Sequence, residues 1–162
     1  MKKDFIQKQG RIGVTARIRR LNDKIMFSAK KAYQLLEIDI EPNWHLVLLL
    51  LKKEEKLTVT EIAKILEFTH PAIIKIVTKM KQKKYLTTIN DPRDSRRQLL
   101  KLSKKAIKDL PELEEKWEFI REIQHQIISD SLLKELAIFE NKLKEKSIEQ
   151  RIEEKLEKTQ ND

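Results

Sequence analysis

The 162-residue chain contains no cysteine, only two glycines, and no long apolar run. Without cysteine it can form neither a disulfide framework nor a thiolate zinc site. The longest apolar run, at residues 46–51, is far shorter than the roughly 20 residues that a membrane-spanning helix needs. The basic N-terminus does not have the pattern of a signal peptide. We therefore expect a cytoplasmic protein, and the missing cysteines are compatible with a reducing compartment.

The sequence also lacks the motifs that carry catalysis. Its three histidines, His45, His70 and His125, are far apart, and no pair has the spacing of metal ligands. There is no glycine-rich phosphate loop and no nucleophile elbow. The carboxylates stand in charged helical runs, for which solvation is the ordinary explanation. We expect a protein that is not an enzyme and that holds no metal or cofactor.

Charge, in contrast, is abundant and unevenly distributed. The chain has 35 basic and 26 acidic residues, a formal net charge of +9. Residues 1–36 hold ten basic and two acidic residues, and residues 69–102 hold nine and two. The segments 37–68 and 103–162 are both net acidic. Such segregation favours a polyanionic partner over a basic surface that serves only solubility.

The stretch from Thr58 to Lys84 has the pattern of two short helices joined by a tight turn. Thr58 and Glu61 form a capping box for a helix over 58–66. Thr69 can cap a second helix over 69–84, with Pro71 in its first turn. Apolar residues at helical spacing should face inward: Ile62, Ala63, Ile65, Leu66, Ile73, Ile76, Val77 and Met80. The second helix keeps four lysines outside: Lys75, Lys79, Lys81 and Lys83. The pattern indicates a helix-turn-helix.

A β-hairpin is predicted directly after this helix pair. Residues 85–89 and 98–102 are rich in strand-forming and leucine side chains and should pair as two strands. The polar segment between them, 90–97, carries three arginines, which suits insertion into the negative potential of a DNA minor groove. We expect Asp94 to hold a neighbouring arginine in a bidentate ion pair.

Four segments therefore follow one another: TEIAKIL, HPAIIKIVTKM, KKYL and DPRDSRRQLLKLS. In order and spacing they resemble the multiple antibiotic resistance regulator (MarR) family of bacterial winged helix-turn-helix transcription factors. The aspartate–x–arginine signature of the family's wing falls on Asp94-Ser95-Arg96. Two positions depart from the family: Lys84 stands where glycine is usual, and Ile74 where a small hydroxyl residue is usual. We expect a strained left-handed cap at Lys84 or Tyr85 and, at Ile74, contact with a thymine methyl as one option.

The resemblance implies a mainly α-helical fold with a small β-hairpin wing. We expect a single domain over 1–162, with a winged helix-turn-helix lobe at 38–102. Within it, the recognition helix is expected at 69–84 and the wing at 85–102. The segments 1–37 and 103–162 would be dimerisation helices, because their apolar stripes exceed what the lobe can cover and two-fold pairing would bury them.

Three further expectations concern the helices. The helix at 44–53 should be buried nearly all round, since residues 46–51 are all apolar. Pro111 should kink or restart the long helix that Ser103 begins. After Lys144 the tail is either a helix docked on a partner or frayed.

The resemblance places candidate DNA contacts on the recognition helix and the wing. They are Thr69, His70, Ala72, Ile74, Lys75, Lys79, Arg93, Asp94, Arg96 and Arg97. Arg93 at the wing tip is the strongest candidate, because little else there needs an arginine. Lys75 and Lys79 would contact phosphate or guanine, although solvated lysines would need no explanation. Arg97 as a plain strand residue and Thr60 as a phosphate contact or a surface residue stay open.

Members of the family often bind small aromatic or anionic effectors between the dimerisation helices and the lobe. The candidates for such a pocket here are Tyr33, Trp44, His45 and Trp117, for which core packing is the commoner explanation. The sequence thus predicts a homodimeric regulator, typically a repressor, that binds double-stranded DNA at a pseudo-palindromic operator and is released by an effector. The alternative is a protein-interaction module whose winged helix has lost DNA binding.

Overall fold

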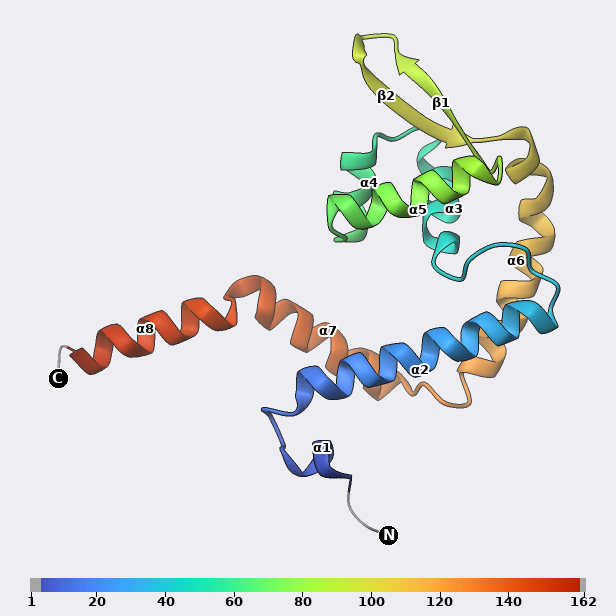
Figure 1. Cartoon of the computed structure of the whole chain (residues 1–162). Helices are drawn as coiled ribbons and strands as arrows, with labels where there is room; N and C mark the ends of the chain where they lie inside the picture. The colour runs from blue at the N-terminus through green and yellow to red at the C-terminus, as the bar shows by residue number, and fades with distance from the viewer. Residues whose placement is uncertain (1–3, 161–162) are drawn as a thin grey trace. The chain divides into compact units, whose positions relative to one another are not determined.

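The computed structural model describes residues 4–160, apart from the side chain of Ser95, and divides into two compact units, 1–116 and 117–162. In chain order the elements are α1 (Phe5–Lys8), α2 (Val14–Leu35), α3 (Trp44–Glu54), α4 (Val59–Leu66), α5 (His70–Gln82), β1 (Leu86–Asp91), β2 (Asp94–Leu102), α6 (Lys104–Gln124), α7 (Asp130–Glu145) and α8 (Ile148–Gln160) (Figure 1). The predicted class, mainly α with one hairpin, is confirmed. None of the described helices is long and apolar enough to span a membrane.

The core of the first unit lies where α3, α4 and α5 meet the hairpin. Its largest fully buried side chains are Trp44, Val47, Leu48, Leu51, Ile62, Ile73 and Met80. Each such side chain contributes about 1.5–3 kcal/mol relative to exposure. The prediction that α3 is buried all round is wrong, because Leu46 and Leu49 are each 37% exposed. Ile65 likewise lies outside the core, at 51% exposed.

The helix-turn-helix forms as its capping residues predict. Thr58 Oγ1 accepts the backbone N–H of Glu61 at 3.1 Å, and Glu61 Oε2 accepts the backbone N–H of Thr58 at 2.8 Å. Thr69 Oγ1 accepts the N–H of Ala72 at 3.4 Å, so α5 begins one residue after the cap. Glu67, with φ +53°, ends α4 in the left-handed conformation and turns the chain into α5. The four inward-facing residues predicted for α5 are all buried.

The hairpin is longer than the sequence indicated. β1 and β2 pair antiparallel with Leu86 opposite Leu102, and the pairing continues to Asn90 opposite Gln98. Beyond this the register shifts, so that Asp91 lies opposite Asp94 and residues 95–97 bulge from β2. The predicted eight-residue polar turn is therefore reduced to Pro92 and Arg93, and its other residues belong to the strands.

The junction between α5 and the wing is strained and tightly held. Lys84 has φ +61°, so the left-handed cap expected at Lys84 or Tyr85 falls on Lys84. Ser103 Oγ donates to the carbonyl of Lys84 at 2.6 Å and accepts the N–H of Ala106 at 3.0 Å, which begins α6. Tyr85 packs edge-on against Trp44, with ring centroids 5.9 Å apart. α6 runs through Pro111 without a restart.

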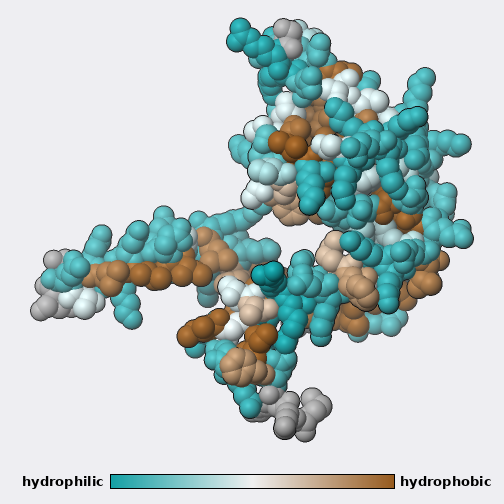
Figure 2. Space-filling model, in the orientation of Figure 1, coloured by the Kyte–Doolittle hydropathy of each residue, from teal (hydrophilic) through white to brown (hydrophobic). Residues whose placement is uncertain are grey.

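Apolar stripes remain uncovered on the long helices. On α2, Ile18, Leu21 and Ile25 are 46–56% exposed. In the second unit no described residue is buried, and Ser129 caps α7 as predicted. The tail after Lys144 forms the separate helix α8, whose apolar stripe shows as a brown band in Figure 2.

Candidate nucleic-acid interface

The outer face of α5 is defined by its buried side. Because Ile73, Ile76, Val77 and Met80 face the core, helical spacing turns Lys75 directly outward. Thr78 and Gln82 share this outward stripe and are exposed. His70 and Ile74 lie on one flank of the stripe; His70 is exposed, and Ile74 is 45% exposed. Among the described residues the Lys75 ammonium has no ion-pair or hydrogen-bond partner.

The other flank of α5 is occupied within the molecule. Lys79 Nζ lies 3.5 Å from Glu41 Oε1. Lys83 Nζ forms an ion pair with Asp39 Oδ1 and also donates to the Asp39 carbonyl at 3.0 Å. The two lysines of this flank thus have intramolecular partners, whereas Lys75 does not.

The wing tip is shaped by an aspartate. Asp91 Oδ1 accepts the backbone N–H of Arg93 at 2.9 Å, which closes the turn at Pro92 and Arg93. The guanidinium of Arg93 has no partner among the described residues. It is exposed at the end of a hairpin that projects from the helices of the lobe (Figure 1). A charge presented in this way is available to an external anion.

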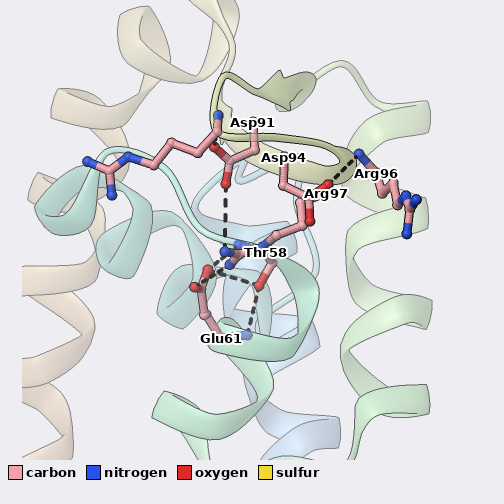
Figure 3. Close-up of polar contacts among 7 residues, drawn as sticks. Thr58, Glu61, Asp91, Asp94, Arg96 and Arg97 are labelled. Carbon is pink, nitrogen blue, oxygen red and sulfur yellow. Dashed lines mark hydrogen bonds and ion pairs between the residues drawn. The ribbon is translucent and has the colours of Figure 1, made fainter.

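The expected bidentate pair of Asp94 with an arginine is wrong. Asp94 Oδ1 instead accepts the backbone N–H of Arg96 at 3.0 Å, because the bulge brings that amide to the carboxylate. The Arg96 side chain extends away from this contact (Figure 3). Asp94 therefore shapes the wing backbone and leaves the guanidinium of Arg96 uncommitted.

Arg97 turns towards the helices and has two acidic partners. Its Nη2 donates to Glu61 Oε1 at 2.9 Å, and its Nη1 lies 3.7 Å from Asp91 Oδ2 (Figure 3). The hydrogen bonds from Thr58, and to a smaller extent the charge of Arg97, lower the pKa of Glu61. The carboxylate therefore stays ionised and joins the wing to the first turn of α4. Arg97 is more than a plain strand residue.

The effector candidates lie in different surroundings. Tyr33 and Trp44 are buried at 6% and 1% exposure, and His45 Nδ1 lies 2.6 Å from the carbonyl of Pro42. Trp117 belongs to the second unit. A groove of about 410 Å³ opens elsewhere, and none of the four lines it. Its lining residues are Leu51, Lys52, Glu55, Lys56, Lys101, Leu102, Ile107, Leu110, Pro111 and Glu114. An effector pocket at the four aromatic positions stays a prediction.

Sequence reasoning missed several residues of this surface. The helical period alone would have placed Thr78 and Gln82 on the outward stripe of α5. Glutamine is a side chain that can form paired hydrogen bonds with adenine. Glu61 was recognised as a cap, but its second bond to Arg97 depends on the fold of the wing. Asp39 and Glu41 carried no local signal, since their partners are about 40 residues away in sequence. Within the described part of the chain, no cluster of three or more histidines and carboxylates could hold a metal ion.

Comparison with known proteins identifies a family match over the winged helix-turn-helix. Residues 38–97 match the sequence model of the MarR family, so the resemblance found in the sequence is confirmed. No curated protein is similar enough in sequence to match the chain.

Solved structures extend the comparison beyond the winged helix. Reduced AbfR bound to DNA has a TM-score of 0.63 at 19% identity, over 86% of this chain and 96% of that one. The MepR–DNA complex from S. aureus gives 0.64 at 19% identity, over 80% and 94%. A MarR/EmrR family transcriptional regulator from Acinetobacter sp. ADP1 gives 0.63 at 24% identity, over 82% and 92%. At these identities the structures establish a shared fold.

Proposed function

We propose that this chain, whose winged helix-turn-helix segment belongs to the MarR family, is a transcriptional regulator that binds double-stranded DNA as a homodimer. The outward stripe of α5 would enter the major groove, and Arg93 would reach the adjacent minor groove. Lysine and arginine side chains would displace counterions from the phosphates. Two of the three solved structures described above are complexes with DNA, which supports the same partner here.

The observation that carries the proposal is the pair of uncommitted cations on α5 and the wing. Lys75 and Arg93 belong to different elements of one compact unit, and neither has a partner among the described residues. The side chains of Lys81 and Arg96 are likewise without a partner among the described residues, whereas three neighbouring cations are paired: Lys79 with Glu41, Lys83 with Asp39, and Arg97 with Glu61. A surface that served only solubility would not need this distinction between paired and exposed charges.

Dimerisation is proposed from the uncovered apolar stripes. Leu132, Leu133, Leu136, Phe139 and Leu143 on α7 are 39–54% exposed. Neither α7 nor α8 contains a buried residue. A second copy with two-fold symmetry would cover them and would present two recognition helices to two half-sites.

Repression by occlusion of a promoter, and release by a small effector, are the finer parts of the proposal. Both come from the family and not from the geometry of this chain. They predict that the bound operator overlaps a promoter and that a ligand weakens DNA binding.

The test is a fluorescence anisotropy titration of a labelled random duplex with the full chain at two salt concentrations. We expect binding at low salt that weakens steeply at higher salt, because phosphate contacts dominate non-specific affinity. A folded protein that leaves the anisotropy unchanged at low salt would contradict DNA binding. That result would favour the alternative, a protein-interaction module on a winged-helix scaffold.

A further inference from the structure

We propose that Asp39 and Glu41 act as internal competitors of DNA phosphate for Lys83 and Lys79, and so limit the affinity of α5 for the DNA backbone. The inference rests on the DNA-binding function proposed above and adds a feature that limits the affinity for DNA. It assigns a role to the segment between α2 and α3, which lies outside the helix-turn-helix and the wing.

The segment is held in place by alternate burial of its side chains. Ile38 and Ile40 are 7% and 6% exposed, and Pro42 is also buried. Asp39 and Glu41 fall between them and are not buried. The backbone N–H of Ile38 donates to the carbonyl of Tyr33 at 2.8 Å, which ties the start of the segment to the end of α2. The apolar anchors thus fix the backbone, and the two carboxylates remain outside the core.

Each carboxylate contacts one lysine, either Lys79 in the last turn of α5 or Lys83, which caps the C-terminus of α5. Asp39 contacts Lys83 through its carboxylate and its carbonyl, and Glu41 contacts Lys79 at 3.5 Å. Residues 79 and 83 are one helical turn apart, so they share one flank of α5. The spacing of the two acids along the segment therefore matches the spacing of the two lysines.

These ion pairs can be replaced by an external anion. The four side chains are 41–79% exposed, so water and salt screen their attraction. A phosphate that approached either lysine would have to displace a carboxylate and would also be repelled by it. The counterion release that a lysine normally contributes is thereby reduced for Lys79 and Lys83 and retained for Lys75.

The decisive variant is Asp39→Asn combined with Glu41→Gln, which removes both negative charges and changes little in shape. In anisotropy titrations with a random duplex, it should bind more tightly than wild type at low salt. The plot of log affinity against log salt should become steeper by about one to two units, as two lysines become available to phosphate. The single variant Glu41→Gln disturbs folding least and should steepen the slope by about one unit.

Glu37→Gln is the matched control, because Glu37 is an exposed acid in the same segment without an ion pair to α5 among the described residues. It should keep the wild-type slope. Lys79→Ala with Lys83→Ala should change the wild-type slope little, yet should cancel the gain when it is added to the asparagine–glutamine variant. This non-additivity is the signature of direct competition.

The inference is overturned if the variant with both acids neutralised, once circular dichroism shows it folded, matches Glu37→Gln. It is equally overturned if that variant binds less tightly than wild type, since the acids would then position α5 for DNA. A wild type that does not bind would contradict the proposed function instead. In that case binding gained by the double variant would support the competition, and absence of binding in both would refute both proposals.

Discussion

The guanidinium of Arg97 on β2 lies 2.9 Å from Glu61 Oε1 in the first turn of α4. The other oxygen of the same carboxylate accepts the backbone N–H of Thr58 at 2.8 Å. One side chain therefore closes the cap of α4 and anchors the wing. The helix-turn-helix and the hairpin are thus joined by a contact that salt and pH can both weaken.

Glu61→Ala should lower the free energy of unfolding by about 1 kcal/mol, since it removes the capping box. Glu61→Gln should lower the free energy of unfolding by less, because its amide oxygen can still accept the backbone N–H of Thr58. The pKa of Glu61 lies below its ordinary value of 4.5, so its ionised form stabilises the fold fully above that pH. The stabilisation is lost as the pH falls through the lower, folded-state pKa. Urea unfolding of both variants at neutral and acid pH measures this, and an unchanged acid dependence in Glu61→Gln would contradict it.

Arg93→Ala should weaken duplex binding at low salt by about 1–3 kcal/mol, because the wing tip loses its uncommitted guanidinium. Arg93→Lys keeps the charge and should recover only part of this loss if the side chain enters a minor groove. Anisotropy titration of both folded variants provides the measurement. Wild-type affinity in Arg93→Ala would remove the wing tip from the interface.

Lys75→Ala should flatten the dependence of log affinity on log salt by about one unit if Lys75 contacts phosphate. Lys134→Ala, on α7 in the other unit, removes the same charge from the molecule and serves as the control. A slope equal to that of the control would reassign Lys75 to solvent or to a base edge.

Lys84→Gly should raise the free energy of unfolding by about 1 kcal/mol, because glycine adopts a positive φ without the cost that a side chain incurs. Lys81→Gly places the same residue inside α5 and should lower it by a similar amount. Denaturant unfolding compares the two. A destabilised Lys84→Gly would show that the lysine side chain itself supports this junction.

Leu136→Glu should shift the chain towards monomer, because it puts a charge into the uncovered apolar stripe of α7. Asn141→Glu introduces the same side chain on the polar side of the helix and should leave the oligomeric state unchanged. Size-exclusion chromatography with light scattering reports the mass directly. A monomeric wild type would contradict the proposed homodimer.

Local signals carried most of what could be predicted. Capping at Thr58, Thr69 and Ser129 depends on residues three positions apart, and the inward face of α5 depends on its own period. The resemblance to the family limited the left-handed cap to Lys84 or Tyr85, and the structure has it at Lys84. Contacts between distant segments could not be predicted in this way.

Two of the errors depend on how segments that are distant in sequence come together. Asp94 was assigned a guanidinium, but the bulge in β2 brings it a backbone amide instead. Lys79 was predicted to contact DNA in the same way as Lys75, but it forms an ion pair with Glu41. Whether a surface lysine is exposed or paired depends on which loop the fold places beside it, and periodicity does not contain that information.

The most direct test of the account is the salt dependence of duplex binding by wild type and by the Lys75→Ala, Arg93→Ala double variant in one titration series. If α5 and the wing contact the same duplex, wild type should bind at low salt, and the variant should bind more weakly with a slope flatter by about two units. A wild type that ignores duplex DNA, or a folded variant with the wild-type slope, would contradict the claim that these two cations form the binding surface.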